Sequence, residues 1–153
     1  MNLTIAAVFK RLTPFEKQWI DTYLKRLQTL CKTSLVHIKE SGADSESSKQ
    51  KIGQQLEKII SPGAVVCLLD EKGKRFGSQQ LADHLSLLEQ QACKELIFIV
   101  GGAHGHPDAI IQRADLMLRL SDFTLAHRLA LLVLSEQLYR AYSIKKGLPY
   151  HHV

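Results

Sequence analysis

The chain has 153 residues, 45% of them hydrophobic and 23% charged, so it is long enough to bury one hydrophobic core without disulfides or a structural metal. Lysine and arginine outnumber aspartate and glutamate by 20 to 15, which permits nucleic-acid binding without establishing it. The longest apolar runs, Ala64–Leu69 and Leu129–Leu134, are far shorter than the roughly 20 residues that span a bilayer. These features argue against a disordered chain and against a membrane protein.

The first sixty residues read as strands alternating with helices. Thr13-Pro14-Phe15-Glu16 is typical of a helix start, because Thr13 can cap the helix and Glu16 completes a capping box. This helix is expected to run to about Leu30. The small, polar segment Ser41–Ser48 reads as a loop. The other expected elements are strands at Leu3–Phe9 and Ser34–Lys39 and a helix over roughly Ser48–Ile60.

The alternation continues through the second half. The uninterrupted apolar run Ala64–Leu69 is typical of a strand buried on both faces, and Asp70–Gly77 reads as a charged loop. Ser78 is expected to cap the helix that follows. The remaining expected elements are a strand at Leu96–Val100, a turn at Gly101–Gly105, a short helix around Asp108–Ala114, a strand at Leu116–Leu120 and a long helix from Thr124 to about Lys146.

This order of strands and helices predicts an α/β fold, a mostly parallel sheet flanked by helices, in a single domain over residues 1–153. The three cysteines, Cys31, Cys67 and Cys93, are far apart and form no CxxC pair. We therefore expect neither a disulfide framework nor a zinc site, and a reducing, cytoplasmic location.

The turn Gly101–Gly105 is the strongest local signal for a ligand. Glycines let a backbone turn sharply at a strand end and let a ligand approach main-chain groups, and ligands of open α/β sheets bind beyond the carboxyl ends of the strands. A plain tight turn is the alternative. Neither a Walker loop nor a GxGxxG pattern is present, so a nucleotide-phosphate cradle is not supported.

Several polar residues have an ordinary interpretation beside a functional one. Asp70 could orient a ligand at a strand end, but an exposed loop charge is the simpler account. His104 and His106 lack the partners of a metal site and read as solvated loop histidines. His127 could transfer protons or could cap or pack a helix. Glu136, four residues before an arginine, reads as half of a helix-surface ion pair.

A series of motifs then carries a family resemblance over nearly the whole chain. In order they are TYLKRL at 22–27, LLDEKGK at 68–74, FIVGGAHG at 98–105, QRAD at 112–115, LSDFTLAH at 120–127, EQLYRAYSI at 136–144 and GLPYHH at 147–152. Together they resemble the RlmH family, SPOUT-class methyltransferases that act on a pseudouridine of large-subunit (23S) ribosomal RNA.

The resemblance implies a SPOUT fold with a C-terminal trefoil knot, one of the rare exceptions to unknotted chains. It implies S-adenosylmethionine (SAM) as cofactor, no metal, and methyl transfer to N3 of a pseudouridine in the assembled ribosome. It also implies a homodimer with the last helix in the interface. The positions that it marks for the cofactor are Leu69, Gly101, Gly102, Gly105, Leu120, Ser121, Asp122, Phe123, Thr124 and Leu125.

For catalysis the resemblance points to Tyr150 and His151 in a tail that would close over an active site, that of the same or of the partner subunit. His127 and Arg140 join them as candidates for proton transfer and for orienting the RNA. The general base stays open among these residues. Basic side chains that could contact phosphates are Arg128, Lys145 and Lys146.

Three positions depart from the family's usual residues. Ala126 stands where proline is usual, Leu131 where arginine is usual and Phe9 where glycine is usual. The missing arginine motivates an alternative function, a catalytically weakened module of the same fold that binds the ribosome or RNA. A methyltransferase of this fold acting on another RNA is a third possibility.

Overall fold

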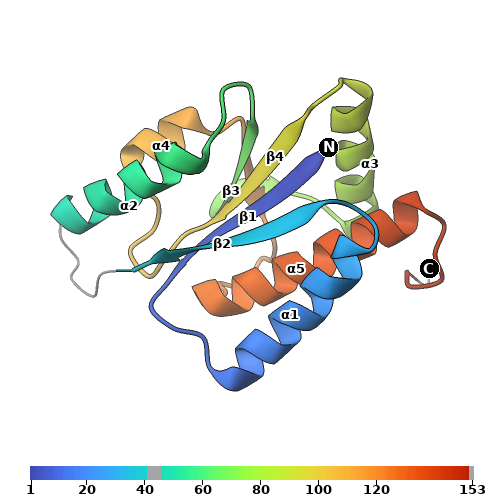
Figure 1. The fold of residues 1–153 in the computed structure, drawn as a ribbon, viewed down its shortest axis with the longest axis horizontal. Coiled ribbons are helices and arrows are strands. Elements are labelled where there is room, and N and C mark those ends of the chain that lie inside the picture. The colour runs from blue at the N-terminus through green and yellow to red at the C-terminus, as the bar shows by residue number, and fades with distance from the viewer. Residues whose placement is uncertain (41–45, 152–153) are drawn as a thin grey trace.

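In the computed structural model, residues 1–40 and 46–151 are described, and they alternate strictly between strands and helices (Figure 1). The strands are β1 (Asn2–Phe9), β2 (Thr33–Lys39), β3 (Val65–Arg75), β4 (Glu95–Val100) and β5 (Leu116–Arg119). The helices are α1 (Pro14–Gln28), α2 (Glu46–Ile59), α3 (Ser78–Gln90), α4 (Asp108–Arg113) and α5 (His127–Lys145).

The five strands form one sheet in the order β2-β1-β4-β3-β5, and every neighbouring pair is parallel. Helices α1, α3 and α5 cover one face of this sheet, and α2 and α4 cover the other (Figure 1). The predicted α/β class with a parallel, helix-flanked sheet is therefore confirmed. Among the described residues, no helix is both long and apolar enough to traverse a lipid bilayer.

After Glu95 at its start, the central strand β4 is apolar at every position, and its packing shows why. Leu96 and Phe98 pack in the core under α1, α3 and α5, while Ile97 and Ile99 pack in the second core under α2 and α4. Successive side chains of a strand point to opposite faces, so a strand covered on both sides needs an apolar residue at every position.

The predicted start of α1 is confirmed. Thr13 Oγ1 accepts a hydrogen bond from the Glu16 backbone N–H at 3.3 Å, and Glu16 Oε2 accepts one from the Thr13 N–H at 2.7 Å. The expected C-terminus of α5 is also confirmed, since Gly147 follows it with a φ of +64°.

The charged loop predicted at Asp70–Gly77 is wrong for its first part. Strand β3 continues to Arg75 and pairs with β5 on both sides of a register shift, with Leu69 and then Lys74 opposite Leu118. An added Cβ at Gly73 would lie 2.6–2.7 Å from backbone atoms of residues 117 and 118. The extension is polar because it only borders β5, so its sequence lacks the apolar pattern of the buried strands.

Three expected helix starts also need correction. Gly77, rather than Ser78, is the N-cap of α3, and α5 starts at His127 rather than at Thr124. The helix predicted from Ser48 starts at Glu46, so the last part of the expected loop is helical. The rest of that loop, residues 41–45, lies outside the described residues.

Candidate active site

A cavity of about 470 Å³ lies at the edge of the sheet where β4 and β5 end and where the pairing of β3 with β4 ends. The carboxyl ends of parallel strands meet at one edge of a sheet, and the backbone groups there are not all used by the sheet. The cavity walls are residues 69–72 at the register shift within β3, residues 100–103, 105 and 106 from the end of β4 and the turn after it, and residues 118–121, 123–127 and 130 from β5 to the first turn of α5.

The glycine turn fits this place because side chains would collide with their surroundings. A Cβ at Gly101 would lie 3.1–3.3 Å from three atoms of the His106 ring, and one at Gly102 would lie 2.4 Å from Glu40 Oε1. Gly105 has a φ of +76°, and its N–H donates to the Gly102 carbonyl at 3.2 Å. The turn therefore brings His106 back over Gly101 and leaves main-chain atoms facing the cavity.

His106 joins two of the three walls. Its Nε2 lies 2.7 Å from the Leu69 carbonyl oxygen, and because a carbonyl only accepts, Nε2 donates. Its Nδ1 is buried and has no hydrogen-bond partner among the described residues. The interpretation as a solvated loop histidine is wrong for His106, whereas His104 is exposed. Spacing alone could not separate the two, since only the turn decides which one folds back.

Glu40, at the end of β2, supports the turn from behind and was not singled out from the sequence. Its side chain is buried, and Oε1 accepts a hydrogen bond from the Ala103 N–H at 2.8 Å. Nothing in the local sequence marks Glu40, because its contact crosses β1 to reach the loop after β4.

The structure places most of the predicted cofactor residues around this cavity. Asp122 is the exception: it does not line the cavity, and it forms ion pairs with Arg75 at 3.1 Å and Arg119 at 3.2 Å. That the predicted cofactor residues bind a cofactor stays a prediction. The predicted residues that line the cavity are Leu69, Gly101, Gly102, Gly105, Leu120, Ser121, Phe123, Thr124 and Leu125.

Two further residues from the sequence interpretation border the cavity. His127 lines it from the first position of α5. Asp70 also lines it, and its Oδ1 accepts a hydrogen bond from the Lys72 N–H at 2.8 Å, which shapes the turn after Leu69. Asp70 is therefore more than an exposed loop charge.

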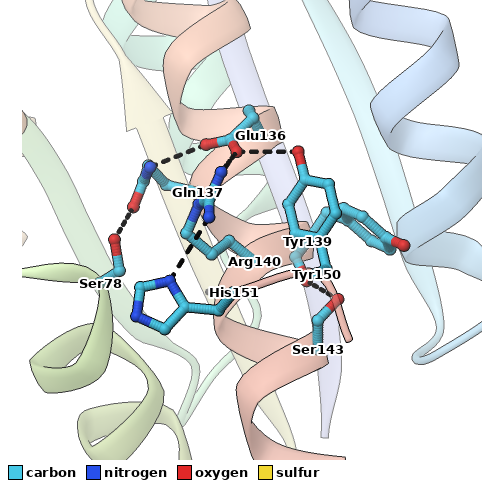
Figure 2. Close-up of polar contacts among 8 residues, drawn as sticks. All are labelled: Ser78, Glu136, Gln137, Tyr139, Arg140, Ser143, Tyr150 and His151. Atoms are coloured by element: carbon cyan, nitrogen blue, oxygen red, sulfur yellow. Dashed lines mark hydrogen bonds and ion pairs between the residues drawn. The ribbon is translucent and has the colours of Figure 1, made fainter. Parts of the chain in front are cut away.

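The other three predicted catalytic residues form a separate cluster on α5 and the tail (Figure 2). Tyr150 donates to Glu136 Oε1 at 2.9 Å, and Arg140 donates to the same oxygen through Nε at 3.0 Å. Arg140 Nη1 lies 3.4 Å from His151 Nδ1, and its guanidinium lies 4.6 Å from the centre of the Tyr150 ring. None of these residues lines the cavity. Arg140 follows His127 by more than three helical turns, roughly 20 Å along the axis.

Contacts within the cluster also raise the pKa values of Tyr150 and Arg140. Burial raises the pKa of the Tyr150 phenol, and hydrogen bonds with Tyr23 and Glu136 raise the pKa further. The hydrogen bond to Glu136 raises the pKa of Arg140. At neutral pH Tyr150 is therefore a neutral hydrogen-bond donor and Arg140 a cation.

Two of the basic residues expected to contact phosphate are held by acids. Lys145 Nζ lies 2.8 Å from Glu89 Oε2 with a side chain only 12% exposed, and Arg128 Nη1 lies 3.0 Å from Glu16 Oε2. Lys146 is exposed. The departure Leu131 is fully buried in the core, so this residue packs the helix against the sheet. Across residues 1–40 and 46–151, no group of three or more histidine, cysteine, aspartate or glutamate side chains could hold a metal ion.

Fold and cavity together define a class, parallel α/β proteins with a cavity at the strand ends that a glycine turn helps to wall. The family model described as "Predicted SPOUT methyltransferase" matches residues 1–151, and the chain belongs to this family. Its relatives include proteins named "Ribosomal RNA large subunit methyltransferase H" from Alkaliphilus oremlandii, 38% identical, Bacillus pumilus, 37% identical, and Geobacter metallireducens, 35% identical. Each match covers 99% of both chains. The resemblance to the RlmH family is thereby confirmed.

Proposed function

We propose that this protein transfers a methyl group from SAM to N3 of a pseudouridine in large-subunit ribosomal RNA, as a homodimer in the cytoplasm. The observation that carries the proposal is the cavity at the register shift of β3 and the ends of β4 and β5, whose walls include the glycine turn and residues 120, 121 and 123–125. Family membership supports methyl transfer, and the name shared by the relatives supports ribosomal RNA as substrate.

The residues present fit SAM. A volume of about 470 Å³ falls in the usual range for small-ligand sites, roughly 300–1,000 Å³. A Cβ would crowd the His106 ring at Gly101 and would meet Glu40 at Gly102, so a glycine backbone fits both positions of this wall. We assign the holding of the cofactor to main-chain groups of Leu69, Gly101 and residues 120, 121 and 123–125. When bound, SAM supplies a methyl group on a positively charged sulfur, which is a good leaving group.

On the RNA side, the chain's residues have to orient the base and remove a proton. N3 of a uracil ring is protonated at neutral pH and a poor nucleophile, so positioning and proton removal dominate the barrier. His127 lines the cavity, which makes it our candidate proton acceptor. Tyr150 stays protonated at neutral pH, so its part is to donate a hydrogen bond or to stack on a base.

A second copy of the chain would bring the two halves of the site together. The cluster of Arg140, Tyr150 and His151 does not line the cavity of its own chain, so the tail of one protomer would serve the cavity of the other. Large apolar side chains are exposed on α1, on the first turn of α5 and on the cavity wall, as an interface requires. They are Phe15 at 67%, Trp19 at 43%, Phe123 at 83% and Leu129 at 46%.

We also propose the trefoil knot of the SPOUT class. The support is local: β3 runs on past the end of its pairing with β4 and meets β5 again after the register shift. Gly73 lies directly against the backbone of residues 117 and 118, as expected where two chain segments cross closely.

The test is to incubate the purified protein with methyl-labelled SAM and ribosomes from a strain that lacks the modification. Label on N3 of a large-subunit pseudouridine supports the proposed reaction. Ribosome binding without label would favour the weakened binding module, and label on isolated transfer RNA would favour another substrate. The burial of Leu131 favours the enzyme, because the residue that stands in place of the usual arginine packs in the core and does not line the cavity.

A further inference from the structure

The carboxylate of Glu136 is the centre of the polar cluster on α5 (Figure 2). Its Oε1 accepts hydrogen bonds from Arg140 and from the Tyr150 hydroxyl, and its Oε2 accepts one from Gln137 Nε2 at 2.7 Å. One carboxylate therefore binds two of the predicted catalytic side chains. The simple helix-surface ion pair expected from the sequence would involve Arg140 alone, without the hydrogen bond from Tyr150.

The bond to Tyr150 is the long-range part of this arrangement. The chain leaves α5 at Gly147, with the Leu148 N–H bonded to the Ser143 carbonyl at 2.9 Å, and then returns toward the helix. The Tyr150 ring packs edge-on against the Tyr139 ring, with 4.6 Å between the ring centroids. These packing contacts hold the ring, while the hydroxyl and the guanidinium above the ring are both directed by Glu136.

Glu136 is itself held from the other side. Gln137 donates to Glu136, and its Oε1 accepts a hydrogen bond from Ser78 Oγ at 2.7 Å. Ser78 is the first residue of α3, only a few positions after the β3 extension that borders the cavity. The carboxylate is thus fixed between the start of α3 and the tail, with a side chain only 18% exposed.

We propose that Glu136 is a positioning residue of the methyl transfer, which sets Tyr150 and Arg140 in the orientation that the reaction uses. This inference rests on the proposed function. Glu136 does not line the cavity, so it acts through the two side chains that it binds and not on the cofactor. A misplacement of about 1 Å in such a group costs on the order of a hundredfold in rate.

The experiment compares Glu136→Gln, Tyr150→Phe and the double variant in full-length protein on unmodified ribosomes. We expect Glu136→Gln to lower kcat by about tenfold to a hundredfold, with SAM affinity within about twofold of wild type. In the Tyr150→Phe background the same change should cost much less, because contacting residues that act as a unit are not additive. Asp21→Asn, which removes an exposed ion pair with Lys17 on α1, is the matched control and should leave kcat unchanged.

The positioning role would be overturned if Glu136→Gln had the wild-type kcat, or if its loss and that of Tyr150→Phe were additive in the double variant. It would also be overturned if Glu136→Gln lost SAM binding and had a lower melting temperature. A second readout separates this proposal from the proposed function. In protein with carbon-13-labelled tyrosine, Glu136→Gln should move the Tyr150 ring resonance and lower the pH at which this phenol titrates. If wild type transfers no methyl group, the proposed function fails, and an unchanged Tyr150 resonance overturns the role of Glu136 by itself.

Discussion

The cavity at the strand ends and the cluster on α5 differ in what they are made of. Around the cavity, glycines and main-chain groups form much of the wall, and one extra carbon atom at Gly101 or Gly102 would meet a neighbour at 3.3 Å or less. In the cluster, charged and aromatic side chains surround one carboxylate, and the backbone takes little part. The cavity is therefore sensitive to the size of a residue, and the cluster to its chemistry.

Under the proposed function, this difference fits a division of roles between holding the cofactor and handling the RNA base. A cofactor that is the same in every turnover can be recognised by a fixed backbone shape, which costs no side-chain entropy to order. An RNA base that must be oriented and deprotonated needs donors, acceptors and charge. If the division holds, variants of the cavity change binding, and variants of the cluster change the rate of transfer.

The largest expected effect is on stability, at the place where the β3 extension lies against β5. Gly73→Ala would put a Cβ within 2.6–2.7 Å of rigid backbone at residues 117 and 118, so we expect a loss of about 3 kcal/mol. Gly53→Ala in α2 is the control, because its Cβ would make an ordinary contact of 3.4 Å with Pro107 and alanine favours helix, a gain of up to about 1 kcal/mol. Urea unfolding measures both, and equal midpoints would contradict the close crossing.

The next largest effect is on cofactor binding. Gly101→Val should abolish measurable SAM binding in calorimetry while the protein stays folded, because the side chain would push His106 away from the Leu69 carbonyl and fill the wall. In the smaller variant Gly101→Ala, a second change, His106→Ala, should restore part of the affinity by making room. Wild-type affinity in Gly101→Val would show that the cofactor binds elsewhere.

Sequence reasoning predicted the cavity well because its signals are local. Apolar strands ended by glycines, at carboxyl ends that a parallel sheet must bring together, locate the site without any structure. The β3 extension was missed because a polar stretch at the border of β5 has no apolar periodicity. His106 was missed because only the fold of the turn distinguishes it from His104.

The cluster was predicted in its members but not in its organisation. The motifs marked Arg140, Tyr150 and His151, yet spacing made Glu136 one half of a surface pair. Its bonds to Tyr150, and through Gln137 to Ser78, join parts of the chain that are far apart in sequence. No period in a sequence encodes such contacts. This is also why only Asp122, of the predicted cofactor residues, lies off the cavity, since its two ion pairs depend on tertiary placement.

A third prediction tests the independence of the two regions. A chain ended after Pro149 lacks Tyr150 and the residues that follow, so it should bind SAM like wild type but transfer no methyl group, measured on labelled ribosomes. Normal turnover would remove the tail from the reaction. Mixing this truncated chain with Gly101→Val sharpens the result, because a mixed dimer holds one intact cavity facing one intact tail. Activity regained from two inactive proteins is expected, and no regain would place cavity and tail in the same protomer.

The smallest effect concerns the link between α1 and the start of α5. Glu16 caps α1 and lies 3.0 Å from Arg128, beside His127. The hydrogen bond from the Thr13 N–H lowers the pKa of Glu16, and Arg128 lowers it further. Because the folded-state pKa of Glu16 is lowered, its ionised carboxylate stabilises the fold at neutral pH. This stabilisation is lost as the pH falls through the folded-state pKa. The Glu16 side chain is partly exposed and its charge is partly screened by solvent, so Glu16→Gln should cost only about 0.5–1 kcal/mol near pH 7, mainly through the cap.

Urea unfolding of wild type and Glu16→Gln at about pH 7 and about pH 3 measures this effect. The difference between the two proteins should shrink at the lower pH, where a larger fraction of the wild-type carboxyl group is neutral. A difference that grows on acidification would mean that the charge of Glu16 destabilises the fold. If SAM affinity and transfer rate are unchanged in Glu16→Gln, then α1 is joined to α5 by a contact that neither cavity nor cluster uses.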